Sequence, residues 1–322
     1  MIFNIGTNEP TFDFSVTGFS GAKVTIANEK GSITKTTGSD GSAVFEKMKK
    51  GTWQVTAADG KESAAYEVQI GRGFSNTLNI NSIPTFMYNG SYKIVDDNDN
   101  VITQSLKNWK IRFLSTGTLN LRDLNGAAGG IDVFCVGGGG NGGNGSLIND
   151  VDGGGGGGGG GGYTTTKIGV TVQKGTYDIY VGGSGGKTSA FGVSANGGGN
   201  GGSYGGNGGN GGSGGGAGTW SNNVPAAGGT NGSDGHAYVT LGGNAGKGQG
   251  NPPGTREFHE SNGKLYSSGG KGGTAGNYPT DRTTAANTGN GGNGGNSGSW
   301  FNATERSGVA GGSGIVIIRN KR

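Results

Sequence analysis

The first 80 residues alternate between apolar and polar positions in short runs. A period of two is typical of strands that bury one face. It predicts six strands, at Thr11–Val16, Lys23–Ala27, Ser32–Thr36, Ala43–Phe45, Trp53–Ala57 and Ala65–Ile70. Turn-forming residues separate several of these runs, at Gly38–Gly41 and at Ala58–Gly60. Short strands at this spacing favour a β-sandwich.

A second group of apolar runs follows, at Ser91–Val95, Trp109–Leu114, Thr118–Leu124 and Ile131–Val136. The last run is almost wholly apolar, which is typical of a central strand buried on both faces. Further runs lie at Tyr163–Val172, Thr176–Val181 and Ile315–Arg319. We therefore expect a second β core whose strands lie near residues 91–136, 163–181 and 315–319.

Glycine is distributed very unevenly along the chain. Residues 137–322 hold 65 of the 80 glycines, and residues 1–136 hold only 15. Two glycine-rich excursions, 137–162 and 182–314, interrupt the second β core. Polar residues recur every third position within them, at Asn290, Asn293 and Asn296 and at Tyr204, Asn207, Asn210 and Ser213. A period of three is that of the polyproline II helix.

These excursions predict packed polyglycine II helices. Only glycine lets such helices lie close enough for the N–H groups of one to meet the carbonyls of its neighbours. Asparagine at every third position would then point outward to water. The alternative is a flexible linker, but the strand at 315–319 has to return to the core. The predicted fold class is all-β: an Ig/prealbumin-like β-sandwich, then a β-sandwich-type core that carries packed polyglycine II helices.

Composition and charge narrow the classes of function. The net charge of +4 is scattered without a dense basic run, so we expect no nucleic-acid partner. The one cysteine, Cys135, excludes a disulfide framework within the chain. The N-terminus lacks the features of a secretory signal, and no apolar run reaches the length of a membrane span. We expect synthesis in a cytoplasm and no membrane insertion.

Motifs that could carry chemistry are incomplete. The segment Gly182–Ser189 resembles a phosphate-binding loop, but Val181 stands where its first glycine belongs and no helix can follow. The run Gly137–Gly145 fits a dinucleotide fingerprint only because it is polyglycine. Neither His236 nor His259 has a second ligand at zinc spacing. We therefore predict no enzyme, no cofactor and no metal site.

Aromatic residues on non-glycine islands between the tracts are the candidate contacts. Rigid rings beside asparagine, serine and arginine are suited to recognition, including stacking on sugars. The candidate receptor contacts are Trp220, Tyr238, Phe258, Tyr266, Tyr278, Trp300 and Phe301. In the alternative, these rings plug the ends of the glycine bundle or pack on the β core.

Two stretches resemble known families. GSDGSAVFEKMKKGTWQVTAADG (Gly38–Gly60) is similar to carboxypeptidase-regulatory-like, prealbumin-type Ig-like modules, which implies a spacer or attachment domain at residues 1–82. The ordered pieces at 131–140, 162–186, 189–199, 254–270 and 311–319 resemble the glycine-rich domain of tail-fibre-type proteins. These belong to phages and prophages of Gram-positive, Clostridia-like hosts. Residues 83–322 would form that domain.

The second resemblance implies a virion protein, such as a tail fibre or receptor-binding adhesin, made in the bacterial host cytoplasm. Fibre-tip adhesins of T-even-type phages are looser relatives, with packed polyglycine helices whose loops contact the host. The implied partners are other virion proteins, through the N-terminal module, and a bacterial surface glycan or protein. Fibres are often trimers, so a homotrimer is the assembly suggested. Alternatives are a head fibre, capsid decoration or fibre shaft without a receptor role, and ice binding.

Overall fold

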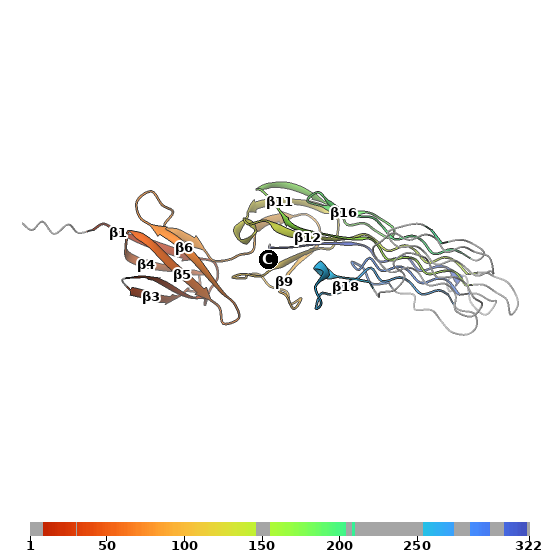
Figure 1. Cartoon of the computed structure of the whole chain (residues 1–322), viewed down its shortest axis with the longest axis horizontal. Helices are drawn as coiled ribbons and strands as arrows, with labels where there is room; N and C mark the ends of the chain where they lie inside the picture. The colour runs from red at the N-terminus through yellow and green to blue at the C-terminus, as the bar shows by residue number, and fades with distance from the viewer. Residues whose placement is uncertain are drawn as a thin grey trace, which may run out of the picture. The chain divides into compact units, whose positions relative to one another are not determined.

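The computed structural model describes residues 9–29, 31–145, 155–203, 208–209, 254–273, 284–296 and 306–320, and the account below is limited to them. These residues form strands, extended tracts and two short 3-10 helices, so the all-β class is confirmed. The chain forms two compact units (Figure 1). The first contains residues 1–85, 94–110 and 122–129, and the second contains 86–93, 111–121 and 130–322. The expected boundary after residue 82 differs from this division, because the two later segments belong to the first unit.

The first unit is built on two sheets. One is three-stranded with the order β4-β1-β7, and the other is four-stranded with the order β3-β2-β5-β6. Strands β1 and β7 pair in parallel, while β2, β3, β5 and β6 form an antiparallel ladder. The seven strands are β1 (Thr11–Thr17), β2 (Lys23–Asn28), β3 (Gly31–Thr36), β4 (Ser42–Lys49), β5 (Gly51–Ala58), β6 (Ser63–Ile70) and β7 (Thr77–Asn79).

The period of two decides which side chains of these sheets are buried. Strand β5 buries Trp53, Val55 and Ala57 and exposes the residues between them. Residues from both sheets, among them Phe14 of β1 and Val55 of β5, join one hydrophobic cluster, as a sandwich requires. All six strands predicted in this region are confirmed. Strand β7, which has only three residues, was not predicted.

The later strands form a five-stranded sheet of order β13-β12-β19-β10-β9 and a three-stranded sheet of order β14-β11-β8. Two small hairpins, β15-β16 and β17-β18, accompany them. The strands are β8 (Thr85–Tyr88), β9 (Tyr92–Val95), β10 (Lys110–Phe113), β11 (Gly117–Asp123), β12 (Ile131–Val136), β13 (Thr164–Val170), β14 (Gly175–Ile179), β15 (Thr188–Ala190), β16 (Val193–Ala195), β17 (Thr255–Arg256), β18 (Leu265–Tyr266) and β19 (Ile315–Asn320). The 3-10 helices are η1 (Asn125–Ala127) and η2 (Glu257–His259).

Strand β12 is an interior strand of the five-stranded sheet. It pairs with β13 on one side and with β19 on the other, and all six of its residues are buried. The prediction of a central, doubly buried strand is therefore confirmed. Phe134 and Val136 share one face with Ile317 of β19. On the opposite face Cys135 lies beside the β15-β16 hairpin, with its Sγ 3.9 Å from the Val193 carbonyl.

Candidate functional site

In the part of the chain that the structure describes, six glycine-rich tracts extend from the second β core and lie side by side (Figure 1). We name them tract A (137–145), tract B (155–162), tract C (196–203), tract D (267–273), tract E (289–296) and tract F (306–314). Tract A follows β12 directly, tract B leads into β13, and tract F leads into β19. The ladder of the sheet therefore sets where these three tracts meet the sheet.

Hydrogen bonds from tract A change direction with a period of three. The N–H groups of Gly137, Gly140 and Gly143 donate to tract B or to Tyr163, which follows it, at 2.8–2.9 Å. The N–H groups of Gly139, Gly142 and Gly145 donate to tract F at 2.8–2.9 Å. Three residues per turn bring every third group to the same neighbour. The packed polyglycine II helices predicted from the spacing are confirmed among the described residues, whereas Tyr204, Asn207, Asn210 and Ser213 lie outside them.

The tracts are arranged around a triangle of three inner members. Tracts A, B and E bond to one another: Gly140 donates to Gly160, Gly159 donates to Gly292, and Gly292 donates to Gly140, each at 2.8 Å. Each of the three outer tracts packs against a different pair of these inner tracts. Tract C bonds to A and B, tract D bonds to B and E, and tract F bonds to A and E. Each outer tract therefore has two inner tracts as hydrogen-bond partners.

Glycine is required in these tracts because there is no room for a β-carbon. A Cβ built on Gly138 would lie 1.7 Å from the Gly183 carbonyl oxygen, and one on Gly291 would lie 1.9 Å from that of Gly159. The α-hydrogens point at these oxygens instead, as in the Cα–H···O contacts of β-sheets. Backbone hydrogen bonds between tracts therefore replace the side-chain core that the region lacks.

The asparagines at every third position are not simply directed to water, which corrects the prediction. The Oδ1 atoms of Asn290 and Asn293 accept the N–H groups of Ser268 and Lys271 of tract D, at 2.9 and 2.8 Å. Asn296 is buried, with 1% of its surface exposed. The physical reason is that an outer tract has N–H groups that face no backbone carbonyl, and the amide oxygen satisfies them.

The far ends of the tracts lie together. Gly145 of tract A donates to the Arg306 carbonyl of tract F at 2.8 Å, and Gly273 of tract D donates to Gly156 of tract B at 2.8 Å. Asn144 donates to the Ser203 hydroxyl at the end of tract C at 3.1 Å. The chain segments that begin after Gly145, Ser203, Gly273 and Asn296 therefore all start at one end of the bundle.

Two of the seven candidate contact residues are buried, which corrects their assignment as surface contacts. Phe258 and Tyr266 expose 6% and 1% of their surface and pack on Phe134 of β12, with ring centroids 5.6 and 5.7 Å apart. These two rings pack on the β core, as the alternative reading expected. The other five, Trp220, Tyr238, Tyr278, Trp300 and Phe301, lie outside the described residues.

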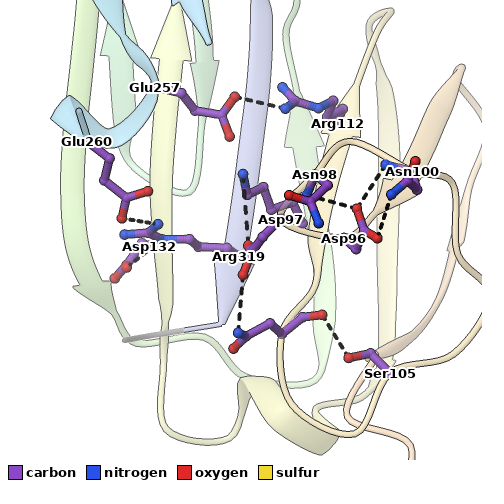
Figure 2. Close-up of polar contacts among 12 residues, drawn as sticks. Asp96, Asp97, Asn98, Asn100, Ser105, Arg112, Asp132, Glu257, Glu260 and Arg319 are labelled. Atoms are coloured by element: carbon purple, nitrogen blue, oxygen red, sulfur yellow. Dashed lines mark hydrogen bonds and ion pairs between the residues drawn. The ribbon is translucent and has the colours of Figure 1, made fainter. Parts of the chain in front are cut away.

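A group of charged and polar side chains, all buried except Glu260, lies beside the start of tract D, and it was not foreseen from the sequence. We call Arg112, Asp132, Glu257, Glu260, Tyr266 and Arg319 the charged cluster; Figure 2 shows its ion pairs. Arg112 contacts Glu257 at 2.8 Å and donates to the Tyr266 hydroxyl at 2.6 Å. Arg319 contacts Asp132 at 3.1 Å and Glu260 at 2.6 Å.

The charged cluster fastens residues 254–266 to one face of the five-stranded sheet. Its arginines come from β10 and β19, and the guanidinium of Arg319 also lies 4.1 Å from the centre of the Phe258 ring. The partners are up to 187 residues apart in sequence, so no local motif signals them. A buried charge that loses its partner is strongly destabilising, so the cluster resists movement of this segment.

The first unit contains a cleft of about 600 Å3 between the β5–β6 turn and residues 96–108. Its carboxylates are already held by nearby donors: Glu62 accepts from the Ser105 hydroxyl at 2.9 Å and from the Lys107 N–H at 3.1 Å. Burial alone would raise the pKa of Asp96, but hydrogen bonds from Asn100 and Asn98 outweigh it, so this pKa is lowered (Figure 2). These contacts organise the loop.

Within the described ranges, no group of three or more metal-ligating side chains could hold a metal ion. Over the same residues, no helix has the length and apolar character needed to cross a membrane. A comparison with curated proteins finds no match to the chain. The model of a family described as a glycine-rich domain matches residues 115–321, which includes every tract of the bundle. The chain belongs to the glycine-rich domain family.

Proposed function

We propose that the chain is a non-enzymatic surface protein of a phage virion, a tail fibre or receptor-binding adhesin that contacts the bacterial surface. The contacts would be made by the segments between the polyglycine tracts. The observation that best supports this proposal is that the far ends of the tracts lie together. Segments that begin after Gly145, Ser203, Gly273 and Asn296 all start from one end of a hydrogen-bonded frame.

The frame suits a binding role because hydrogen bonds between tracts, most of them from the backbone, hold its ends in place. Each tract is bonded to at least two neighbours, so the ends cannot move independently. Binding segments attached to a fixed frame lose less conformational freedom when they engage a partner. The remaining aromatic candidates, at 220, 238, 278, 300 and 301, all lie on segments that start at this end. Tyrosine and tryptophan supply large, rigid contact area.

The first unit has a different role in this proposal. Its sandwich has its own hydrophobic core and resembles an Ig-like spacer or attachment module over Gly38–Gly60. We assign it contacts to other virion proteins, and the bacterial glycan or protein receptor to the glycine-rich unit. A trimer is the assembly that the fibre resemblance suggests. The runner-up is a structural virion component, in which the bundle has no receptor.

Cell binding by the purified full-length chain tests the proposal. One variant replaces the aromatic residues at 220, 238, 278, 300 and 301 by serine. The control variant is Phe74→Ser, which changes a ring in the first unit that is 49% exposed. We expect the five-residue variant to bind Clostridia-like Gram-positive cells at least about tenfold more weakly, the loss that ~1.4 kcal/mol of binding energy produces. The control should bind like the parent chain.

Equal binding by the parent and the five-residue variant would overturn the assignment of the contacts. Loss of binding in the Phe74→Ser control would move the receptor site to the first unit. A gold label on the N-terminus of this chain, located on whole virions by electron microscopy, separates the two candidate functions. Label on the tail supports the adhesin, whereas label on the capsid supports the structural component.

A further inference from the structure

A bundle that repeats every three residues has a problem of register. If one tract slides by three residues, each backbone N–H meets a carbonyl equivalent to the one it left. At 3.1 Å per residue, such a slide moves the tract by about 9 Å. The backbone hydrogen bonds between tracts therefore cannot choose between the two registers, and other contacts have to fix each tract.

In tract E the sequence itself excludes a slide. In one direction Ser297 would arrive at the place of Gly294, where a Cβ lies 2.0 Å from the Gly156 oxygen. In the other direction Thr288 would arrive at the place of Gly291, where it lies 1.9 Å from the Gly159 oxygen. Such overlaps have no space in which to relax.

Tracts A, C and F are fixed by sequence in the same way. In each, a slide in either direction brings a residue with a Cβ to a position where the Cβ would lie 1.7–2.1 Å from a carbonyl oxygen. The arriving residues would be Asn141 or Val136 in tract A, Asn200 or Ala195 in tract C, and Ile317 or Glu305 in tract F. Tract B is preceded by further glycine, but it leads directly into β13, whose pairing with β12 sets its position.

Tract D is the exception among the six. A slide of three residues toward the sheet would bring Gly270, Gly273 and Gly276 to the places of residues 267, 270 and 273. Glycine would again fill the two places where a Cβ would lie 2.0–2.1 Å from the oxygens of Gly292 and Gly295. The strand before the tract, β18, has only two residues. The slide away from the sheet is excluded, because Ser267 would arrive at the place of Gly270. The slide toward the sheet meets no such overlap at 270 or 273, although Ala275 would arrive at the place of the buried Gly272. No long ladder fixes the tract in this direction.

We propose that the charged cluster fixes the register of tract D. Glu257, Glu260 and Tyr266 stand immediately before the tract and are bound to Arg112 and Arg319 of the sheet. A slide toward the sheet would push these residues out of place and separate the ion pairs. Buried polar groups that specify register are the best attested use of such pairs.

The Ser267 hydroxyl adds a contact of the same kind, because it donates to the Gly162 carbonyl and glycine at that place could not. The fixed register also determines the position of the other end of the tract. A slide would displace Gly273, and the start of the segment after it, by about 9 Å. The proposal rests on the geometry of the bundle alone, and it stands whether or not that segment binds a receptor.

Paired cysteines can report the register directly. Lys271→Cys with Asn293→Cys reports the observed register, because the Lys271 N–H contacts the Asn293 side chain at 2.8 Å. Thr274→Cys with Asn293→Cys reports the slid register, in which residue 274 would take the place of Lys271. Asn293 is changed in both, so its loss affects both equally. Burial raises the pKa of Cys135 to about 12, so this native thiol stays protonated and does not compete.

Each cysteine pair is placed in three full-length backgrounds: the parent chain, Glu257→Gln with Glu260→Gln, and Asp178→Asn. Asp178 is an exposed residue of β14 that is hydrogen-bonded to Thr118, so it is the matched neutralisation away from the cluster. Disulfide yield after mild oxidation is measured by mass spectrometry. The parent and the Asp178→Asn chain should form the 271–293 disulfide.

In the Glu257→Gln, Glu260→Gln chain, we expect the ratio of slid to observed disulfide to rise at least about tenfold, which corresponds to ~1.4 kcal/mol. An unchanged ratio would overturn the proposal. If the double variant forms neither disulfide, the single Glu260→Gln variant decides by the same ratio, because its side chain is 40% exposed and less disruptive.

Discussion

At the scale of single residues, the bundle depends on the absence of one carbon atom. At Gly159 a Cβ would lie 2.1 Å from the Gly140 oxygen, and that oxygen belongs to a backbone already bonded on other sides. A side chain could not rotate away from this contact, because the Cβ is fixed by the backbone. At Gly183, by contrast, a Cβ would meet nothing within 4 Å. The two glycines look alike in sequence and differ only in what surrounds them.

This contrast gives the first prediction. Gly159→Ala should lower the free energy of unfolding by at least about 1–3 kcal/mol, the usual cost of overpacking. The matched variant Gly183→Ala should leave it unchanged or raise it by about 0.4–1 kcal/mol, because alanine restricts the unfolded chain. Denaturant unfolding followed by circular dichroism measures both. Similar stability of the two variants would contradict the close packing of tracts A and B.

At the scale of elements, we expect the second unit to require β19 in order to form. It lies between β12 and β10 in the five-stranded sheet, and tract F leads directly into it. Arg319 also takes part in two of the three ion pairs of the charged cluster. The sheet is therefore incomplete until β19 (Ile315–Asn320) pairs with β12, from which it is far apart in the chain. Pairings between distant segments of this kind are slow to form, because the loop between them must close first.

Truncation provides the second prediction. A chain that stops after Ser313 lacks β19 and should lose hydrogen-exchange protection throughout tracts A and E, because β12 loses its partner and tract F its anchor. A chain that stops after Asn320 keeps β19 and is the control. Hydrogen exchange with mass spectrometry compares the two. Full protection of tract A in the shorter chain would show that the bundle forms without this strand.

At the scale of the whole glycine-rich unit, the question is whether sheet and bundle unfold together. The tracts bury few side chains, so their stability comes from hydrogen bonds that each contribute about 0.5–1.5 kcal/mol net. Such bonds offset the conformational entropy of glycine only if many form at once. Tracts A, B and F continue strands of the sheet, so we expect one cooperative unit.

The third prediction follows for native-state hydrogen exchange. Amides that donate to a neighbouring tract, such as those of Gly140 and Gly292, should open with the same free energy as the amides of β12. A flexible linker would instead exchange at the rate of an unfolded chain. Measurement by NMR at increasing denaturant distinguishes the two, since cooperative opening makes the curves merge. Early exchange of the bundle alone would separate it from the sheet.

Local patterns predicted much of this protein. A period of two placed the strands of the first unit, and the apolar run at Ile131–Val136 identified an interior strand of the second. A period of three predicted polyglycine II helices, since the steric freedom of glycine and the absence of a side-chain core leave few other ways to satisfy the backbone. These features depend on residues close together in the chain, so the amino-acid sequence by itself determined them.

Contacts between distant residues were decided only by the tertiary structure. The burial of Phe258 and Tyr266, the bonds of the asparagine side chains across tracts, and the pairing of Arg319 with Asp132 each join segments with no local signal of their partnership. The three-residue repeat shows clearly how local patterns differ from contacts between distant residues. A sequence in which every third position is alike determines how tracts pack, but not which tract lies beside which. That choice belongs to the sheet, because the three-residue repeat is the same in every tract, whereas the strands that the tracts join differ.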